Sequence, residues 1–327
     1  MQTTFADSTF ITSTYDFKGN RSSERDQAGH LTTYQYDLAG RLLTTTTAYG
    51  TADTSSISTG YDGAGRVITS TNALGKATLN TYNNVNQLTK TIDPLGHSII
   101  FTYDQRGLRT QMQDPDGNVV NYTYNVRSQL VKTTFPANYQ GVVISTTQQY
   151  DLAGHVITST DAMGHNTVNG YYSNGQLASV TNPMSQLTSY FYDPNNNLQK
   201  LTDPNLHSLV FTYTALNQLL QKSWPDGSYE SFDYDAVGNQ LHHRLTDGNI
   251  IGYSYDVLNR PTQTSYFDGR SISYGYTANG LRQLVTDTVR SSPVTVSYSY
   301  DNQNRITGIS QPNGLTVAYT YDAAGKS

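Results

Sequence analysis

Histidine is the residue type in this sequence best suited to acid–base chemistry or metal binding, and the chain has 7 copies. Four of them, His30, His97, His165 and His207, occupy one repeat position, the first residue after the glycine position of the second turn in each repeat. A position that recurs with a repeat indicates a surface feature rather than one catalytic or metal centre. His242 and His243 are adjacent, so on a strand they point to opposite faces and make poor co-ligands.

Other short motifs predict no enzyme or metal site either. Gly325–Ser327 (GKS) resembles the end of a phosphate-binding loop, but Thr320 replaces the earlier glycine of that loop. Asp114–Asn118 and Asp193–Asn197 are oxygen-rich like calcium loops, yet neither continues to the required Glu. We interpret both runs as turns, and we predict no catalytic residue, no cofactor and no metal. The lone Trp224 takes the Asp position of a turn; we interpret it as a packing or exposed turn aromatic, with ligand stacking as the alternative.

A Tyr-Asp segment repeats along the whole chain. The pattern Tyr-Asp-x-x-Gly-Arg-Leu is nearly intact at Tyr36–Leu42 and Tyr61–Val67. Copies of it begin at Tyr15, Tyr36, Tyr61, Tyr82, Tyr103, Tyr124, Tyr150, Tyr171, Tyr192, Tyr213, Tyr234, Tyr255, Tyr276, Tyr300 and Tyr321. Most intervals are 21 residues long and the other three are 24 to 26. Self-similarity at a fixed period indicates a repeat architecture, so we assign residues 1–327 to a single repeat array.

Each unit contains two turns. The first is the Asp-x-x-Gly of the motif, as in Asp37–Gly40, where Asp begins a type I turn. Gly then takes the left-handed conformation that closes a three-residue hairpin loop. The second turn lies about halfway to the next motif, as in Asp93–Gly96 and Asp114–Gly117. Two turns in 21 residues leave two strands of about six to eight residues. The sequence therefore predicts a β-hairpin per unit and an antiparallel meander of about thirty strands.

The motif residues are predicted to have structural roles. In the hairpin, Tyr36 should face Leu42 and Asp37 should face Arg41, and such cross-strand pairs stabilise a sheet. Asp62 with Arg66, Asp256 with Arg260 and Asp301 with Arg305 should pair in the same way. The three longer repeats should place their extra residues at the second turn, within residues 44–58, 136–145 and 286–294. The full set of predicted structural positions is Tyr36, Asp37, Gly40, Arg41, Leu42, Tyr61, Asp62, Gly65, Arg66, Tyr103, Asp104, Tyr150, Asp151, Gly154, Tyr234, Asp235, Gly238, Tyr255, Asp256, Tyr300 and Asp301.

Composition excludes several classes of function. The chain has a formal charge of −5 and no basic run, so we predict no nucleic-acid partner. Its apolar stretches are far shorter than a membrane span, so we predict no membrane insertion. The N-terminus lacks the features of a signal peptide, and the absence of cysteine removes disulfide and thiol chemistry.

Thirty neighbouring strands must curve. At about 4.8 Å per strand they make a strip of about 140 Å, and one circle of it would be about 45 Å across. Side chains cannot fill that width, so we predict an open, hollow β-spiral or part of a shell. Two alternatives stay open. A propeller would need seven and a half blades and lacks its Gly-His and Trp-Asp signature, and two hairpin-type turns per unit disfavour a parallel β-helix.

The repeated Y-D-x-x-G-R-L, with D-P-x-G between copies, closely resembles the YD/Rhs repeats. That family includes bacterial Rhs proteins, the B and C components of insecticidal Tc toxins, and the YD shells of animal teneurins. The resemblance implies a hollow β-shell, which in toxin relatives encloses a C-terminal effector and in teneurins supports cell-surface adhesion. It also implies a secreted or cell-surface location. The chain ends inside a repeat, at Tyr321–Ser327, so we expect a short array or a core fragment.

The function predicted from these observations is that of a non-enzymatic structural or encapsulating module. Its expected partners are a C-terminal effector or adjoining repeats, and we expect weak edge-to-edge self-association at the terminal strands. The alternative is a cell-surface recognition module that binds carbohydrate or protein with a Tyr-rich sheet. Exposed aromatic side chains would favour that alternative, whereas rings packed between strands would favour the scaffold.

Overall fold

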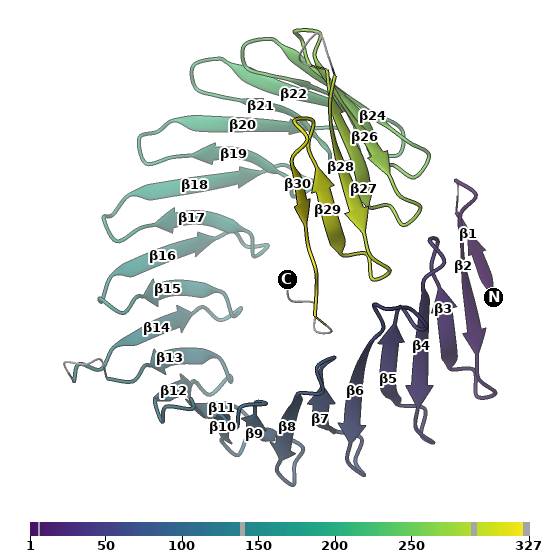
Figure 1. Ribbon diagram of the computed structural model, residues 1–327. Coiled ribbons are helices and arrows are strands. Elements are labelled where there is room, and N and C mark those ends of the chain that lie inside the picture. The colour runs from purple at the N-terminus through teal and green to yellow at the C-terminus, as the bar shows by residue number, and fades with distance from the viewer. Residues whose placement is uncertain (6, 138–140, 289–292, 323–327) are drawn as a thin grey trace. The chain divides into compact units, whose positions relative to one another are not determined.

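The computed structural model describes residues 1–5, 7–137, 141–288 and 293–322, and every regular element in these ranges is a β-strand (Figure 1). The first fifteen strands are β1 Gln2–Thr4, β2 Phe10–Tyr15, β3 Arg21–Arg25, β4 Leu31–Tyr36, β5 Leu42–Thr47, β6 Ser55–Tyr61, β7 Val67–Thr71, β8 Ala77–Tyr82, β9 Leu88–Ile92, β10 Ser98–Tyr103, β11 Arg109–Gln113, β12 Val119–Tyr124, β13 Leu130–Thr134, β14 Ser145–Tyr150 and β15 Val156–Thr160. The others are β16 Asn166–Tyr171, β17 Leu177–Thr181, β18 Leu187–Tyr192, β19 Leu198–Thr202, β20 Ser208–Tyr213, β21 Leu219–Ser223, β22 Tyr229–Tyr234, β23 Gln240–Arg244, β24 Ile250–Tyr255, β25 Pro261–Ser265, β26 Ser271–Tyr276, β27 Arg282–Asp287, β28 Val294–Tyr300, β29 Ile306–Ser310 and β30 Thr316–Ala318.

The strands pair antiparallel with their neighbours in sequence and belong to one 30-stranded sheet. Tyr36 pairs with Leu42 across the β4–β5 hairpin, and Tyr61 pairs with Val67 across β6–β7, as predicted. The all-β meander of hairpins is therefore confirmed. Within the described residues the sheet is open: β1 pairs with β2 and β30 with β29, and these edges do not pair with each other.

The two kinds of hairpin differ in register. In the motif hairpins the register shifts by one residue just before the motif Tyr, so that Gln35 pairs with Thr44 while Tyr36 pairs with Leu42. The second-turn hairpin β3–β4 runs without a shift, from Ser23–Thr33 to Arg25–Leu31. An extra residue on one strand bends it and increases the local twist. The bulge recurs at the motif hairpins along the chain and was not predicted from the sequence.

The longer repeats carry their extra residues at the second turn, as predicted. Strands β5 and β6 stay in register up to the pair Thr47–Ser55, and the insertion lies between them. Pairing in β13–β14 and β27–β28 likewise continues to Thr134–Ser145 and Asp287–Val294. Residues 138–140 and 289–292 of these two insertions lie outside the described residues.

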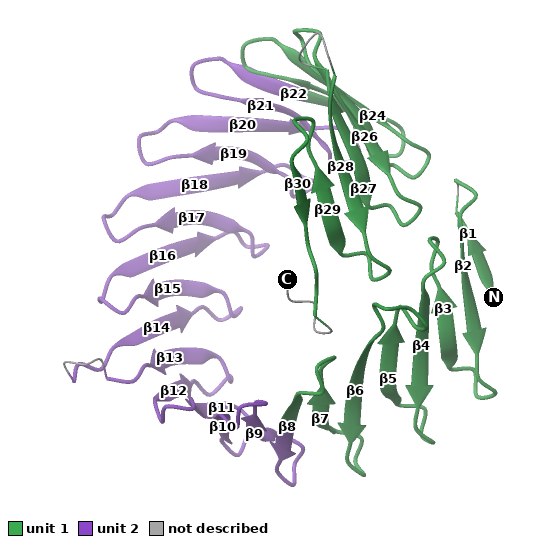
Figure 2. Ribbon diagram, viewed as in Figure 1, with its two compact units in different colours: residues 1–79, 232–327 green, residues 80–231 purple. Residues whose placement is uncertain are grey.

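The chain divides into two compact units, coloured separately in Figure 2. Unit 1 comprises residues 1–79 and 232–327, and unit 2 comprises residues 80–231. Unit 2 is a row of consecutive hairpins from β9 to β21 (Figure 2). Unit 1 combines the first and last hairpins of the sequence. That residues 1–327 work as one array stays a prediction.

The sheet is a single layer. Among the described residues only Ala48, at 2 % exposure, and Thr264, at 8 %, are buried. Motif tyrosines such as Tyr36 and Tyr103 are half-buried. A two-layer protein hides one face of its sheet in a core, so this chain must obtain its cohesion elsewhere. The contacts that supply it lie at the turns.

Candidate functional site: the repeated Tyr-Asp turn

The motif turn is closed by its own aspartate. In the turn Asp37–Arg41 the backbone N–H of Gly40 donates to the Asp37 carbonyl at 3.0 Å, and the N–H of Asp37 donates to the Arg41 carbonyl at 3.0 Å. The carboxylate Oδ1 of Asp37 accepts the backbone N–H groups of Ala39 at 2.8 Å and Arg41 at 2.9 Å. Gly40 has φ +79°, the left-handed conformation that the sequence predicts. Gly65, Gly154 and Gly238 also have positive φ.

The predicted Asp–Arg pairs form. Arg41 Nε lies 2.6 Å from Asp37 Oδ2, and the equivalent pairs at Asp62, Asp256 and Asp301 measure 2.6, 2.7 and 2.6 Å. The backbone N–H of Arg41 is the largest cause that holds the pKa of Asp37 below its ordinary value; partial desolvation opposes it, and the Arg41 side chain adds to it. The same causes lower the pKa of Asp62. The carboxylate therefore acts as a fixed cap of the turn.

The motif tyrosine links its hairpin to the preceding repeat. Tyr36 Oη donates to the backbone carbonyl of Arg21 at 3.0 Å, and Tyr103 Oη donates to that of Leu88 at 2.8 Å. The acceptor is the residue that ends the motif of the preceding repeat. The same bond is made by Tyr61, Tyr124, Tyr150, Tyr171, Tyr213, Tyr255, Tyr276, Tyr300 and Tyr321. The sequence predicts that the Tyr36 ring faces Leu42, but it does not predict the hydrogen bond from the tyrosine hydroxyl to the preceding repeat.

The motif arginine links its turn to the following repeat. Arg41 Nη1 donates to the backbone carbonyl of Asp62 at 3.1 Å. The Arg41 guanidinium also lies over the ring of Tyr61, 4.8 Å from its centroid, within the range of a cation–π contact. Arg260 and Arg305 lie over the next motif tyrosines at 4.9 and 4.6 Å.

Asparagine replaces arginine in some repeats and makes a similar link. Asn197 Nδ2 donates to Asn217 Oδ1 at 2.9 Å, and Asn239 Nδ2 donates to Asn259 Oδ1 at 2.9 Å. Each acceptor lies at the Gly position of the next turn and has φ +61°. Adjacent motif turns are thus held together along one edge of the sheet. The residues predicted to have structural roles lie along this row of motif turns, and the fold does not bring them together into one cleft.

Four of the histidines belong to second turns that are capped in the same way, whereas His242 and His243 lie in strand β23. His97 Nδ1 lies 3.0 Å from Oδ2 of Asp93, the Asp that begins its turn, and His30, His165 and His207 make the same contact at 3.1, 3.1 and 3.3 Å. The described residues contain no group of three or more His, Cys, Asp or Glu side chains placed to hold a metal ion. Asp114 and Asp193 cap turns as expected. Gly325–Ser327 lies outside the described residues.

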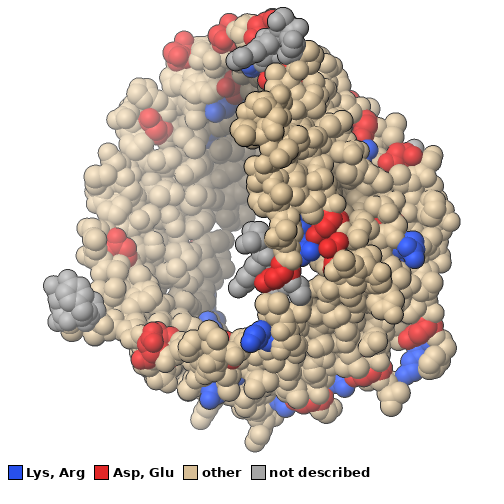
Figure 3. Space-filling model, viewed as in Figure 1, with Lys and Arg blue, Asp and Glu red and all other residues tan. Residues whose placement is uncertain are grey.

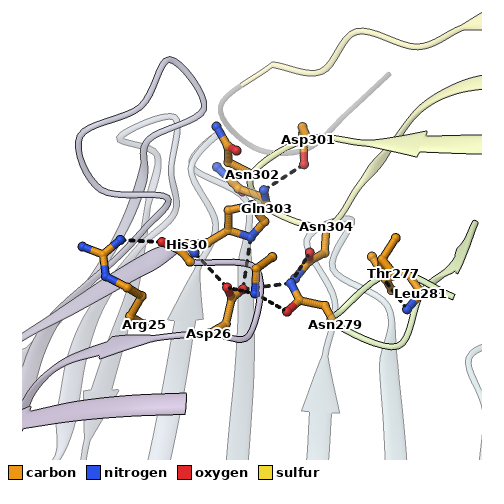
Figure 4. Close-up of polar contacts among 12 residues, drawn as sticks. Arg25, Asp26, His30, Thr277, Asn279, Leu281, Asp301, Asn302, Gln303 and Asn304 are labelled. Carbon is orange, nitrogen blue, oxygen red and sulfur yellow. Dashed lines mark hydrogen bonds and ion pairs between the residues drawn. The ribbon is translucent and has the colours of Figure 1, made fainter. Parts of the chain in front are cut away.

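Within unit 1, turns far apart in sequence meet edge to edge (Figure 4). Asn279 Oδ1 accepts the backbone N–H of Ala28 at 2.9 Å, and its Nδ2 donates to Asp26 Oδ2 at 3.0 Å. The N–H of Asn302 donates to Asp53 Oδ2 at 3.3 Å, and Gln303 donates to the Asp53 carbonyl. Arg260 lies 4.0 Å from Asp7.

These contacts define a seam. The second turns that follow β1, β3 and β5 lie against the motif turns that follow β24, β26 and β28, in the same order. Asn302 and Gln303 are half-buried there, whereas Leu38 and Ala39, at the same positions of a motif turn outside the seam, are exposed. The seam could not be predicted from the sequence, because the seam joins residues about 250 positions apart.

Two pockets interrupt the regular turns of unit 2, and each lies where an aromatic residue takes the Asp position. Tyr172 replaces the motif Asp and lines a pocket of about 620 Å³ with Phe191, Tyr192 and Asp193. Trp224 takes the Asp position of a second turn and lines a pocket of about 420 Å³ with Asp203 and His207. Lys222 Nζ lies 4.4 Å from the Trp224 ring centroid, so a cation already occupies one face of the indole.

The face of the molecule in Figure 3 is mostly uncharged. Acidic and basic side chains lie there in small scattered groups. None of the described elements is a helix with the length and apolarity that a membrane crossing requires. The aspartates of the turns described above are committed to local hydrogen bonds and ion pairs.

Comparison with known proteins identifies the class to which this architecture belongs. Residues 109–292 match the teneurin YD-shell family, and residues 15–52, 61–98, 82–119 and 300–326 match the RHS repeat. The first match covers more than half of the chain, so the chain belongs to the teneurin YD-shell family. The expected resemblance to YD/Rhs repeats is confirmed. No curated protein matches the sequence.

Solved structures of a Tc toxin have the same fold. The TcdB2-TccC3-TEV structure aligns with TM-score 0.78 and 14% identity over 97% of this chain. TcdB2-TccC3 without its hypervariable C-terminal region aligns with the same TM-score and identity. This chain spans 19% of each of those chains. The chain is thus a shell-type repeat module with the fold of part of these larger proteins.

Proposed function

We propose that the chain is a non-enzymatic structural module, part of a hollow wall that encloses another polypeptide. Membership of the YD-shell family and the likeness to TcdB2-TccC3 support a shell role. The proposed cargo is a C-terminal effector, and the proposed neighbours are further YD repeats of the same wall. By the same resemblance, the protein is bacterial and works as a secreted or cell-surface protein.

The observation that carries the proposal is the seam in unit 1. A wall must join its sheet edge to edge, and where turns line those edges the junction is made by side-chain and backbone groups of the turns. Asn279 with Asp26, and Asn302 with Asp53, provide such a junction. The links through Tyr and Arg between successive motif turns join each hairpin to the next. A single layer joined in both directions suits a container better than a globular core.

The proposal of a non-enzymatic role rests on how the polar groups are used. Five of the histidines pair with the aspartate of their own turn, and these pairs recur along the sheet. His242 pairs with Asp233 across the neighbouring strands β22 and β23. Catalysis needs groups that converge on one site. The alternative, recognition through the whole Tyr-rich sheet, is supported less well. The motif rings are half-buried, and hydroxyls such as those of Tyr36 and Tyr103 are committed to backbone carbonyls.

Protease protection tests encapsulation. A flexible peptide with a single cleavage site is joined after Ser327, and the rate of cleavage is measured with a protease that leaves the folded array intact. A matched variant carries the same peptide before Met1, a residue 83 % exposed. Enclosure predicts slower cleavage of the C-terminal peptide than of the N-terminal one, and loss of that difference in urea. Equal cleavage rates in native buffer would reject enclosure by this part of the wall.

A further inference from the structure

The motif turn after β16 departs from the repeat. At the position where the other motif turns carry Asp, Asn or Thr, this turn carries Tyr172. Without a carboxylate, the turn is held by Asn174, whose Oδ1 accepts the N–H of Gln176 at 3.1 Å and whose Nδ2 donates to Gln176 Oε1 at 2.6 Å. The substitution gives up the Asp cap and places an aromatic ring at the turn. Because the turn loses the hydrogen bonds of an Asp cap, we looked for a binding role of the Tyr172 ring.

The Tyr172 ring is fixed and accessible. Its hydroxyl donates to the Tyr190 carbonyl at 2.8 Å, and its ring meets that of Tyr192 edge to face at 6.3 Å between centroids. The side chain remains 40 % exposed, and Phe191 of β18 is 54 % exposed. A ring already held in place loses little conformational entropy when a ligand stacks on it.

The chemistry around these rings is neutral and rich in amides. The pocket of about 620 Å³ is also lined by Asn174, Gln176, Asn196 and Gln199, and its volume falls in the range of small-ligand sites. Among the described residues, the side chains of Asn196 and Gln199 make no hydrogen bond. The only charged lining residue is Asp193, whose carboxylate already binds the N–H groups of Asn195 and Asn197 and the Asn197 amide.

We propose that this pocket, between the motif turns after β16 and β18, binds a neutral carbohydrate chain. Sugar rings present apolar C–H faces that stack on aromatic rings, and hydroxyls that pair with amides, which both donate and accept. No lysine or arginine lines the pocket, so an anionic glycan has no partner in it. The site goes beyond the enclosing role, and its test is independent of the protection assay.

The test titrates the folded protein with cellohexaose, maltohexaose and the N-acetylglucosamine hexamer by calorimetry, with heparin and a decaproline peptide as comparison probes. Tyr172→Asp restores the repeat motif, so it removes the ring while supplying a cap of the kind that Asp37 provides. We expect one neutral hexasaccharide to bind, at least tenfold weaker binding by Tyr172→Asp, and an unchanged or higher Tm for that variant. Phe191→Ser should weaken binding with the turn intact.

Phe267→Ser is the matched control, because Phe267 is an exposed turn aromatic (62 %) that does not line the pocket; this variant should bind the hexasaccharide like the parent. The proposal is overturned if none of the three hexasaccharides binds at millimolar concentration. It is also overturned if Tyr172→Asp binds the hexasaccharide as tightly as the parent, or if only heparin or decaproline binds.

Discussion

Tyr103 and Leu88 belong to successive repeats, and the Tyr103 hydroxyl joins them by donating a 2.8 Å hydrogen bond to the Leu88 carbonyl. The bond recurs along the array and explains why the motif keeps tyrosine where phenylalanine would fill the same space. A ring alone packs against its cross-strand partner, but only the hydroxyl forms a hydrogen bond to the preceding repeat. In a single-layer sheet this connection replaces part of the cohesion that a core would supply.

Removing that hydroxyl should destabilise the array. Tyr103→Phe should lower the free energy of unfolding by about 0.5–1.5 kcal/mol, because a partly buried carbonyl loses its donor. Urea titration followed by circular dichroism measures the change. Tyr49→Phe is the control, since Tyr49 is 56 % exposed and lies outside the motif, and it should have no effect. Equal effects of the two substitutions would show that the hydrogen bond from Tyr103 to Leu88 does not stabilise the array.

The conformation of Gly40 predicts a graded response to substitution. Gly40 has φ +79°, which costs most L-residues about 1–2 kcal/mol. Gly40→Val should therefore destabilise by more than about 1 kcal/mol. Gly40→Asn should be much milder, because Asn217 and Asn259 hold the same position with φ +61°. The urea midpoints of the two variants provide the comparison. A larger loss of stability for Gly40→Asn than for Gly40→Val would contradict a left-handed conformation at this position.

Acid should weaken the turns. The pKa values of Asp37 and Asp62 are lowered from 3.8 in the folded protein. A lowered pKa contributes stability that is present above the unfolded value and is lost as pH falls through the folded value. The free energy of unfolding should therefore decline below about pH 4.

A double variant, Asp37→Asn with Asp62→Asn, isolates this effect. Asn125 caps its turn with Oδ1 bonds of 2.9 and 3.0 Å, so Asn can keep the turn and remove the charge. Urea titrations at pH 7, 5 and 3 should show a smaller decline for the double variant than for the parent. An identical decline would assign the acid sensitivity to other groups.

The seam in unit 1 should be visible by hydrogen exchange. Asn279→Ala removes one of the two acceptors of the Ala28 amide, leaving Asp26 Oδ1 as the other, and it also removes the donor to Asp26 Oδ2. Loss of a bond worth about 1 kcal/mol corresponds to roughly fivefold faster exchange at Ala28. Asn313→Ala is the control, because Asn313 caps only its own turn, at Leu315. Unchanged exchange at Ala28 in Asn279→Ala would mean that the seam does not form in solution.

Local features of this protein could be predicted from the sequence and longer-range ones could not. The pairing of Tyr36 with Leu42 and of Asp37 with Arg41 follows from turn chemistry within seven residues. The link from Arg41 to Asp62 also depends on the bulge and the twist that bring adjacent turns together. The seam depends in addition on the accumulated curvature of many hairpins. The pocket at Tyr172 did leave a signal, an aromatic residue in an Asp position, but only Trp224 was singled out on that ground.

The terminal strands should allow weak association. Strands β1 and β30 are three exposed residues each and pair on one side among the described strands. Unpaired strand edges favour pairing with another chain, so light scattering should show a mass that rises slightly with concentration. A strictly monomeric particle at high concentration would indicate that the array caps itself.

Small-angle X-ray scattering tests the hollow wall most directly. A filled globule of 327 residues has a radius of gyration of about 20 Å. Thirty strands at 4.8 Å spacing, wound into a wall about 45 Å across, place most of the mass about 22 Å from the axis. A monomer with a radius of gyration above about 22 Å and a distance distribution shifted to long vectors is the predicted result. A value near about 20 Å with the distribution of a solid sphere would contradict the shell.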